Sequence, residues 1–205
     1  MLRPLLLGFA LLSFALVLAF TSAVVDAGTA RKLDLAGLVD RSEIVLEGRV
    51  LGRETTLDAR GRPATRYTLS VARTFRGAPA ATRELVLPGG VLPDGRGLVV
   101  PGVPELAPGE DALLFLSTES RAGVRLPVGL SQGRLRVTTT AQGVKRFVRE
   151  HGELELVDER GRSLPTPSRE TFDYATVIAQ VEAACAARAA AEREGRRGRV
   201  REERR

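Results

Sequence analysis

The sequence predicts a mainly β fold, a small antiparallel barrel or sandwich with an α-helix at its C-terminal end. Short runs of aliphatic and β-branched residues recur along residues 33–165, and turn residues separate them about every ten positions. This spacing is typical of sandwiches and barrels, among which the OB type also fits. A strong helical spacing of apolar residues returns only after Pro167. With 43% of its 205 residues hydrophobic, the chain can build a core.

Residues 1–27 have the layout of a secretory signal peptide. One arginine precedes an uncharged apolar stretch at 5–20, and small residues then allow cleavage after Ala23 or Ala27. The alternative is an uncleaved anchor, because residues 5–25 match the length of about 20 that crosses a bilayer as a helix. We therefore expect a secreted or periplasmic protein, or one anchored by its N-terminus.

The first part of the body is predicted to form a short helix and a β-hairpin. Apolar spacing in residues 33–41 indicates a helical turn, for which Asp34 is a candidate N-cap. Residues 43–54 and 64–75 indicate two strands, joined by turn residues at 58–63. The second strand alternates strictly, so we expect one buried and one exposed face.

The remaining strands are expected after a break at 77–81. A strand at 84–87 leads into a long stretch rich in Gly and Pro, residues 88–109, with a brief strand at 98–100. Residues 111–117 (DALLFLS) are a fully apolar run and should form the most buried strand. Shorter strands are expected at 124–128, 133–139, 144–149 and 153–157.

A C-terminal helix is predicted over residues 168–191, with Ser168 or Thr171 as its N-cap. Its apolar stripe consists of Tyr174, Ile178, Val181 and Cys185. The single cysteine of the chain fits this stripe as a small apolar residue.

Residues 192–205 form an Arg-rich tail that we expect to be disordered. Apart from Val200 it consists of Gly, Arg and Glu, so it has too few apolar residues to bury. Residues 188–205 hold eight Arg and four Glu, which accounts for most of the net charge of +6. Such a tail can bind nucleic acid, anionic lipid or acidic polysaccharide. The alternative is a solvated tail, which the excess of Arg over Lys along the whole chain favours.

Catalytic motifs are scarce. Residues 129–133 (GLSQG) match the G-x-S-x-G pattern, whose Ser131 would need a strand-to-helix turn and a later histidine. The residues that follow alternate as a strand, so we expect a hairpin that contains a serine. His151, the only histidine, is expected to lie exposed in a turn.

No cofactor, metal ion or nucleic acid is expected to bind. One His and one Cys cannot build a zinc site without carboxylates, and neither Asp94 nor the pair Glu110 and Asp111 has the spacing of a calcium loop. There is no phosphate-binding G-x-G-x-x-G or Walker motif. Few aromatic residues are available for base stacking, since only 4% of the chain is aromatic.

The order of segments resembles a family of uncharacterised secreted bacterial proteins. The residues that carry the resemblance are LAGLVDRSEIVLEGRV (35–50), YTLSVARTFRG (67–77), LPGG (87–90), PGVPELAPGEDALLFL (101–116) and GLSQGRLRV (129–137). It implies a small secreted β-barrel, but no reaction and no site residue. More distantly, the strands are similar to netrin-type OB barrels, whose disulfide-forming cysteines are absent here.

We therefore expect a non-enzymatic extracytoplasmic binding or envelope module whose partner is a protein or envelope component. Residues 88–109 are the candidate interaction surface, because long loops in compact domains are often functional. The alternative for this stretch is a loop packed over one end of the barrel. Two further hypotheses are a hydrolase that uses Ser131 and an anchored envelope protein whose tail binds polyanions.

Overall fold

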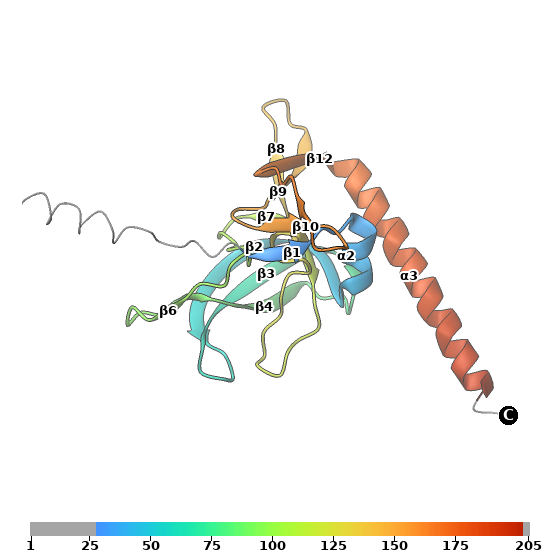
Figure 1. Ribbon diagram of the computed structural model, residues 1–205, viewed down its shortest axis with the longest axis horizontal. Coiled ribbons are helices and arrows are strands. Elements are labelled where there is room, and N and C mark those ends of the chain that lie inside the picture. Colours follow the sequence, from blue (N-terminus) through green and yellow to red (C-terminus); the bar gives the residue numbers. More distant parts are fainter. Residues whose placement is uncertain (1–27, 203–205) are drawn as a thin grey trace, which may run out of the picture.

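The computed structural model describes residues 28–202, and its largest element is a seven-stranded antiparallel sheet with the order β12-β9-β8-β7-β2-β3-β4 (Figure 1). A mainly β fold with a C-terminal helix is thus confirmed. The strands of this sheet are β2 (Ile44–Leu57), β3 (Pro63–Arg76), β4 (Thr82–Pro88), β7 (Asp111–Leu116), β8 (Arg134–Thr139), β9 (Lys145–Glu150) and β12 (Arg169–Asp173).

Two smaller sheets and three helical segments complete the described residues. One sheet contains β1 (Thr29–Arg31), β10 (Glu155–Val157) and β11 (Ser163–Leu164), and the other is the pair β5 (Gly90–Val91) and β6 (Gly97–Leu98). The helical segments are α2 (Leu35–Arg41), the 3-10 turn η1 (Leu130–Gly133) and α3 (Tyr174–Glu202). Asp34 caps α2 as predicted, because its side chain accepts the backbone N–H of Gly37 at 2.7 Å.

The predicted hairpin is confirmed as the long pair β2 and β3. Irregularities in register occur near Leu46, Gly48 and Gly52, and such bulges bend a strand. At Gly48 the neighbouring backbone comes so close that an added Cβ would lie 2.6 Å from the Ser70 carbonyl oxygen. The first half of β2 also pairs with β7, so β2 is an interior strand of the bent sheet.

The sheet has a core on each face. On one face Leu113 and Phe115 of β7 pack against α2 and α3. On the other face Leu114 and Leu116 pack with side chains of β3 and β4, among them Leu69. Ala112 to Leu116 are all buried, which confirms the prediction that this run forms the most buried strand.

Regular strand pairing does not close the sheet into a barrel within residues 28–202. The stretch 117–128 connects the edge strand β4 with the end of β7, because the Arg125 N–H donates to Val86 of β4 and the Ser117 N–H donates to Leu126. The strand predicted at 124–128 is wrong, since this stretch contributes only an isolated bridge between Leu116 and Pro127.

The C-terminal helix begins later and ends later than predicted. Residues 169–173 form β12 and pair with β9, so Ser168 and Thr171 do not cap the helix. Asp173 does, because its side chain accepts the N–H of Thr176 at 2.9 Å. The helix then runs to Glu202, through most of the stretch 192–205 expected to be disordered.

The predicted apolar stripe of α3 packs on the sheet and on α2, with Ile178, Val181 and Cys185 buried and Tyr174 partly buried. Among residues 28–202, no helix is long and apolar enough to cross a membrane. The predicted signal peptide, residues 1–27, lies outside the described residues.

Candidate functional site

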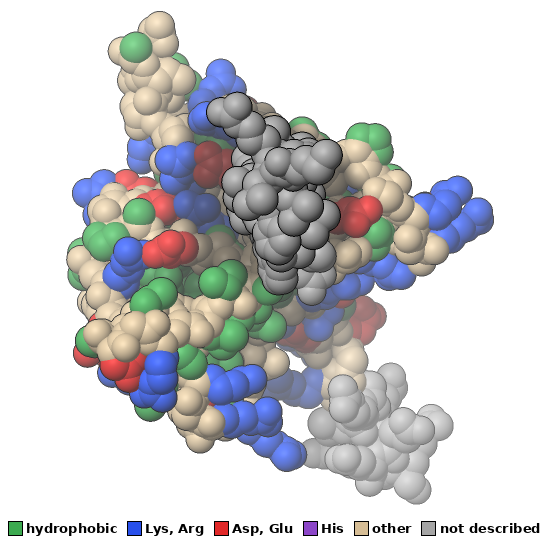
Figure 2. Space-filling model, turned by 60° about the vertical axis from the view of Figure 1, so that its left-hand side comes forward, with side chains coloured by type: hydrophobic (Ala, Val, Ile, Leu, Met, Phe, Trp, Pro, Cys, Tyr) green, Lys and Arg blue, Asp and Glu red, His purple; other side chains and the backbone are tan. Residues whose placement is uncertain are grey.

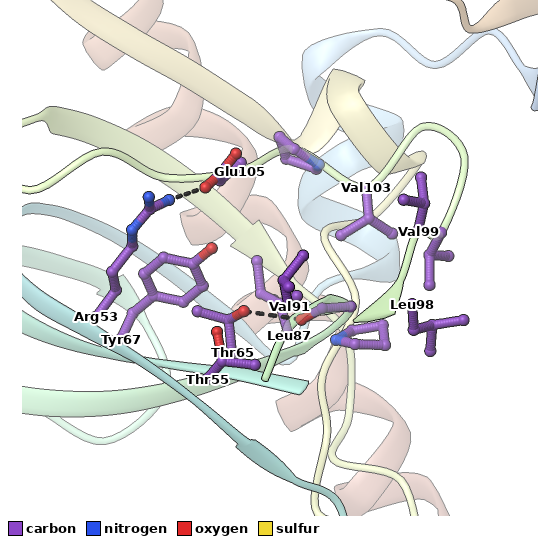
Figure 3. Close-up of a pocket in the computed structure, with 15 residues that line it drawn as sticks. Arg53, Thr55, Thr65, Tyr67, Leu87, Val91, Leu98, Val99, Val103 and Glu105 are labelled. Atoms are coloured by element: carbon purple, nitrogen blue, oxygen red, sulfur yellow. Dashed lines mark hydrogen bonds and ion pairs between the residues drawn. The ribbon is translucent and has the colours of Figure 1, made fainter. Parts of the chain in front are cut away.

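A cleft of about 440 Å³ lies between the β2–β3 hairpin and the Gly/Pro-rich residues 88–109, the predicted interaction surface (Figure 3). The sheet supplies one side through Thr55, Thr65, Tyr67 and Leu87. The opposite side is formed by residues 89–91, 98–100 and 103–105. In the close-up, Tyr67 and the two threonines face Val99 and Val103 across the opening.

Two glycines allow the chain to turn from β4 into this wall. Gly89 and Gly90 have φ values of 103° and 135°, which side chains disfavour. A Cβ on Gly90 would lie 2.5 Å from the Thr65 hydroxyl oxygen. That hydroxyl donates to the Gly89 carbonyl at 2.7 Å, so the corner is held against β3. Asp94 serves the following turn, where it accepts the N–H of Arg96 at 3.0 Å.

A buried tyrosine and an exposed ion pair contribute polar groups to the cleft. Tyr67 is 2% exposed, and its hydroxyl accepts the N–H of the fully buried Leu106 at 3.4 Å. This contact attaches the end of the Gly/Pro-rich stretch to β3. Arg53 and Glu105 form an ion pair at the opening. Both side chains are well exposed, so we expect this pair to contribute little to stability.

Besides this ion pair, the opening of the cleft carries two exposed apolar side chains. Val91 is 67% exposed and Val99 is 85% exposed, although both side chains are fully hydrophobic. Figure 2 turns this side of the molecule toward the viewer, and hydrophobic side chains gather there between basic ones. A concave, mostly apolar site of a few hundred Å³ with a few polar groups is the usual form of a ligand site.

The GLSQG motif lies elsewhere and has a structural role. Ser131 is buried in η1, and its hydroxyl donates to the backbone carbonyl of His151 at 3.4 Å, a long contact that does not involve the imidazole. Gln132, which sequence reasoning missed, is fully buried. Its amide accepts the N–H of Leu33 at 2.8 Å and donates to the Arg31 carbonyl at 2.9 Å. The motif therefore attaches the link between β1 and α2 to the sheet.

The prediction that His151 lies exposed in a turn is wrong. The residue is 2% exposed, and its Nε2 lies 2.8 Å from a carboxylate oxygen of Glu170 on β12. Arg149 lies 3.4 Å from the same oxygen and stacks on the ring of Phe172. Burial raises the pKa of Glu170, but the hydrogen bond from His151 and the charge of Arg149 outweigh it and hold that pKa below its usual value.

This polar cluster joins β9 to β12, and the missed strand explains the error at His151. The alternation of residues 169–173 was the available signal for that strand. Ser131, His151 and Glu170 come together, but the serine hydroxyl contacts a backbone carbonyl and the serine is 5% exposed. A nucleophile needs a hydrogen bond to the base itself and an approach for substrate.

The carboxylates of Glu110 and Asp111, considered above for calcium, are engaged in ion pairs. Glu110 accepts two hydrogen bonds from Arg134, at 2.7 and 2.8 Å, and Asp111 accepts two from Arg49, at 2.9 and 2.6 Å. Within the described part of the chain, no group of three or more His, Cys, Asp or Glu residues could hold a metal ion. Cys185 is buried on α3, and burial raises the pKa of its thiol.

Comparison of the sequence with models of known protein families gives no match, and comparison with curated proteins gives none either.

Proposed function

We propose that this chain is a non-enzymatic binding module that holds an apolar side chain of a partner polypeptide in the cleft between β3 and residues 88–105. The observation that carries the proposal is the pair of exposed valines, Val91 and Val99, at the mouth of a concave site. Exposed apolar side chains around a concavity mark interaction sites more often than isolated ones do.

The lining favours a polypeptide over a charged small molecule. Arg53 and Glu105 are the charged side chains among the lining residues, and they pair with each other. A phosphate or carboxylate would therefore find no unneutralised cation there. The hydroxyls of Thr55 and Thr65 and the backbone of residues 89–90 and 98–100 can instead hydrogen-bond to a peptide main chain.

Binding is favoured over catalysis because the lining residues include neither a histidine nor a cysteine. The export of the protein rests on the layout of residues 1–27, with the partner then a protein or envelope component outside the cytoplasm. The resemblance of residues 35–150 to secreted bacterial proteins points the same way.

Charged substitutions at the mouth test the proposal. A displayed peptide library is selected against the immobilised full chain, and we expect enriched peptides to share an apolar anchor. Val99→Asp and Val91→Asp should each weaken a selected peptide about ten-fold or more, because a carboxylate cannot be desolvated against the apolar wall.

Val144→Asp is the matched control, since Val144 is 45% exposed just before β9 and does not line the cleft. It should leave peptide affinity unchanged. Enrichment of no common anchor, or an equal loss in Val144→Asp, would overturn the cleft as the binding site.

A further inference from the structure

The last part of α3 extends beyond the body. Up to Glu192 the helix is attached: Val181 and Cys185 are buried, Arg188 pairs with Asp40 of α2, and Glu192 pairs with Arg76 of β3 at 2.7 Å. Figure 1 shows the helix continuing past α2 with no other element beside it.

This projecting part presents a basic face. Arg193, Arg196 and Arg197 are exposed and, at i, i+3 and i+4, lie on one side of the helix. Together with Ala189 and Glu192 they line a shallow hollow. None of the three forms an ion pair with residues 28–197, whose side chains the structure describes, whereas Arg188 and Arg76 both pair with carboxylates. The sequence adds four more Arg and two Glu after Arg197.

Packing within the chain does not explain this basic face. Residues 193–197 are all exposed, and glycine at positions 195 and 198 disfavours a helix. Arginine, which supplies all the cations here, binds phosphate oxygens in a bidentate manner and stays charged at every physiological pH. The arrangement therefore favours a phosphate-bearing partner over a role in folding.

We propose that Arg193, Arg196 and Arg197, the arginine arm, bind an anionic phospholipid surface. Basic segments next to a membrane are attracted to its negative surface potential without entering the bilayer. The arm contains no aromatic residue, which argues against stacking on single-stranded nucleic acid. The apolar residues 5–25 independently indicate that the chain meets a membrane, whether or not they are later removed.

The arm and the cleft lie on different sides of the molecule. In Figure 1, α3 extends to one side of the sheet while β6 projects on the other. A molecule bound through its arm would thus present the cleft away from the lipid. This second site does not depend on the function proposed for the cleft.

Vesicle sedimentation of the full chain tests the arm. Vesicles of phosphatidylcholine with about one third phosphatidylglycerol are compared with phosphatidylcholine alone. Insertion of residues 5–25 would be similar in both kinds of vesicle, so the difference in affinity between the two vesicles measures attraction to negative charge. In the triple variant Arg193→Gln, Arg196→Gln, Arg197→Gln, the preference for anionic vesicles should fall about 100-fold, because each arginine contributes about five-fold to the affinity. Higher salt should weaken the difference in the native chain.

The control is Arg60→Gln, Arg66→Gln, Arg121→Gln, which removes the same charge from three exposed arginines of the body. It should retain nearly all the preference for anionic vesicles. Equal losses in both triples would show diffuse attraction and overturn the arm as the site. Tighter binding of duplex DNA than of anionic vesicles, or full competition by inorganic phosphate, would overturn the membrane as the partner. Val99→Asp should not change vesicle binding, so the two proposals fail separately.

Discussion

At the scale of single residues, Tyr174 and Glu47 form a partly buried polar contact that can be tested directly. The Tyr174 hydroxyl donates to the Glu47 carboxylate, with oxygen separations of 2.7 and 2.9 Å, and Glu47, near the start of β2, is only 8% exposed. The tyrosine ring stacks on Phe147 at 4.8 Å. Burial and the neighbouring carboxylate raise the pKa of Tyr174 to about 12.

Tyr174→Phe should lower the free energy of unfolding by about 1–3 kcal/mol, because it leaves a buried carboxylate without its donor. The folded-state pKa is raised above the ordinary value of 10, so this contribution is complete below pH 10 and is lost as the pH rises through about 12. Urea unfolding and a tyrosinate absorbance titration measure both effects. Tyr67→Phe, which loses only a 3.4 Å contact, should cost less; equal losses would contradict the assignment.

Two neighbouring carboxylates provide a second test at this scale. Arg134→Ala should destabilise the fold by about 3 kcal/mol, because Glu110, with 6% of its side chain exposed, would be left as a buried unpaired charge. Arg49→Ala, whose partner Asp111 is 39% exposed, should cost much less, because solvent screens an exposed pair. Chemical denaturation of both variants compares them directly. A similar loss of stability in both variants would mean that burial of the carboxylate does not determine how much each ion pair contributes.

At the scale of elements, η1 joins parts of the chain that are far apart in sequence. Gln132 satisfies backbone groups of Arg31 and Leu33, so it holds the link between β1 and α2 against the sheet. Gly133 allows the end of η1 to lie close to the backbone of Val128, since a Cβ on Gly133 would lie 2.5 Å from the Val128 carbonyl oxygen.

Gln132→Ala should therefore cost about 2 kcal/mol, because the buried N–H of Leu33 and the part-buried carbonyl of Arg31 lose their partner. Hydrogen exchange at the Leu33 amide should accelerate. Ser131→Ala should have a smaller effect, as its hydroxyl makes one long contact. The opposite ranking of the two variants would assign the motif a role centred on the serine.

At the scale of the whole molecule, the N-terminal segment decides where the cleft and the arm operate. We expect a species that lacks residues 1–23 or 1–27 in the periplasm or medium of an expressing cell, because small residues follow the apolar stretch at both sites. Intact mass of the soluble and membrane fractions measures this. A full-length species confined to the membrane would instead identify residues 5–25 as an anchor.

Local chemistry could be predicted from the sequence alone. The Asp34 cap, the alternation in β3, the apolar run of β7 and the stripe of α3 each depend on residues within a few positions of one another. Periodicity and capping depend on the geometry of a single helix or strand, so neighbouring residues in the sequence are enough to predict them.

Only the tertiary structure decided the burial of His151 and the shape of the cleft. His151 is buried because β12 pairs with β9. The run at 169–173 is short and lies between a proline-containing link and a strong helix, so the sequence gave little sign of this strand. The cleft requires Thr65, Gly90 and Val99 to meet through strand register and the bend of β2. Such contacts join distant residues, and no local pattern specifies which strand will lie beside which.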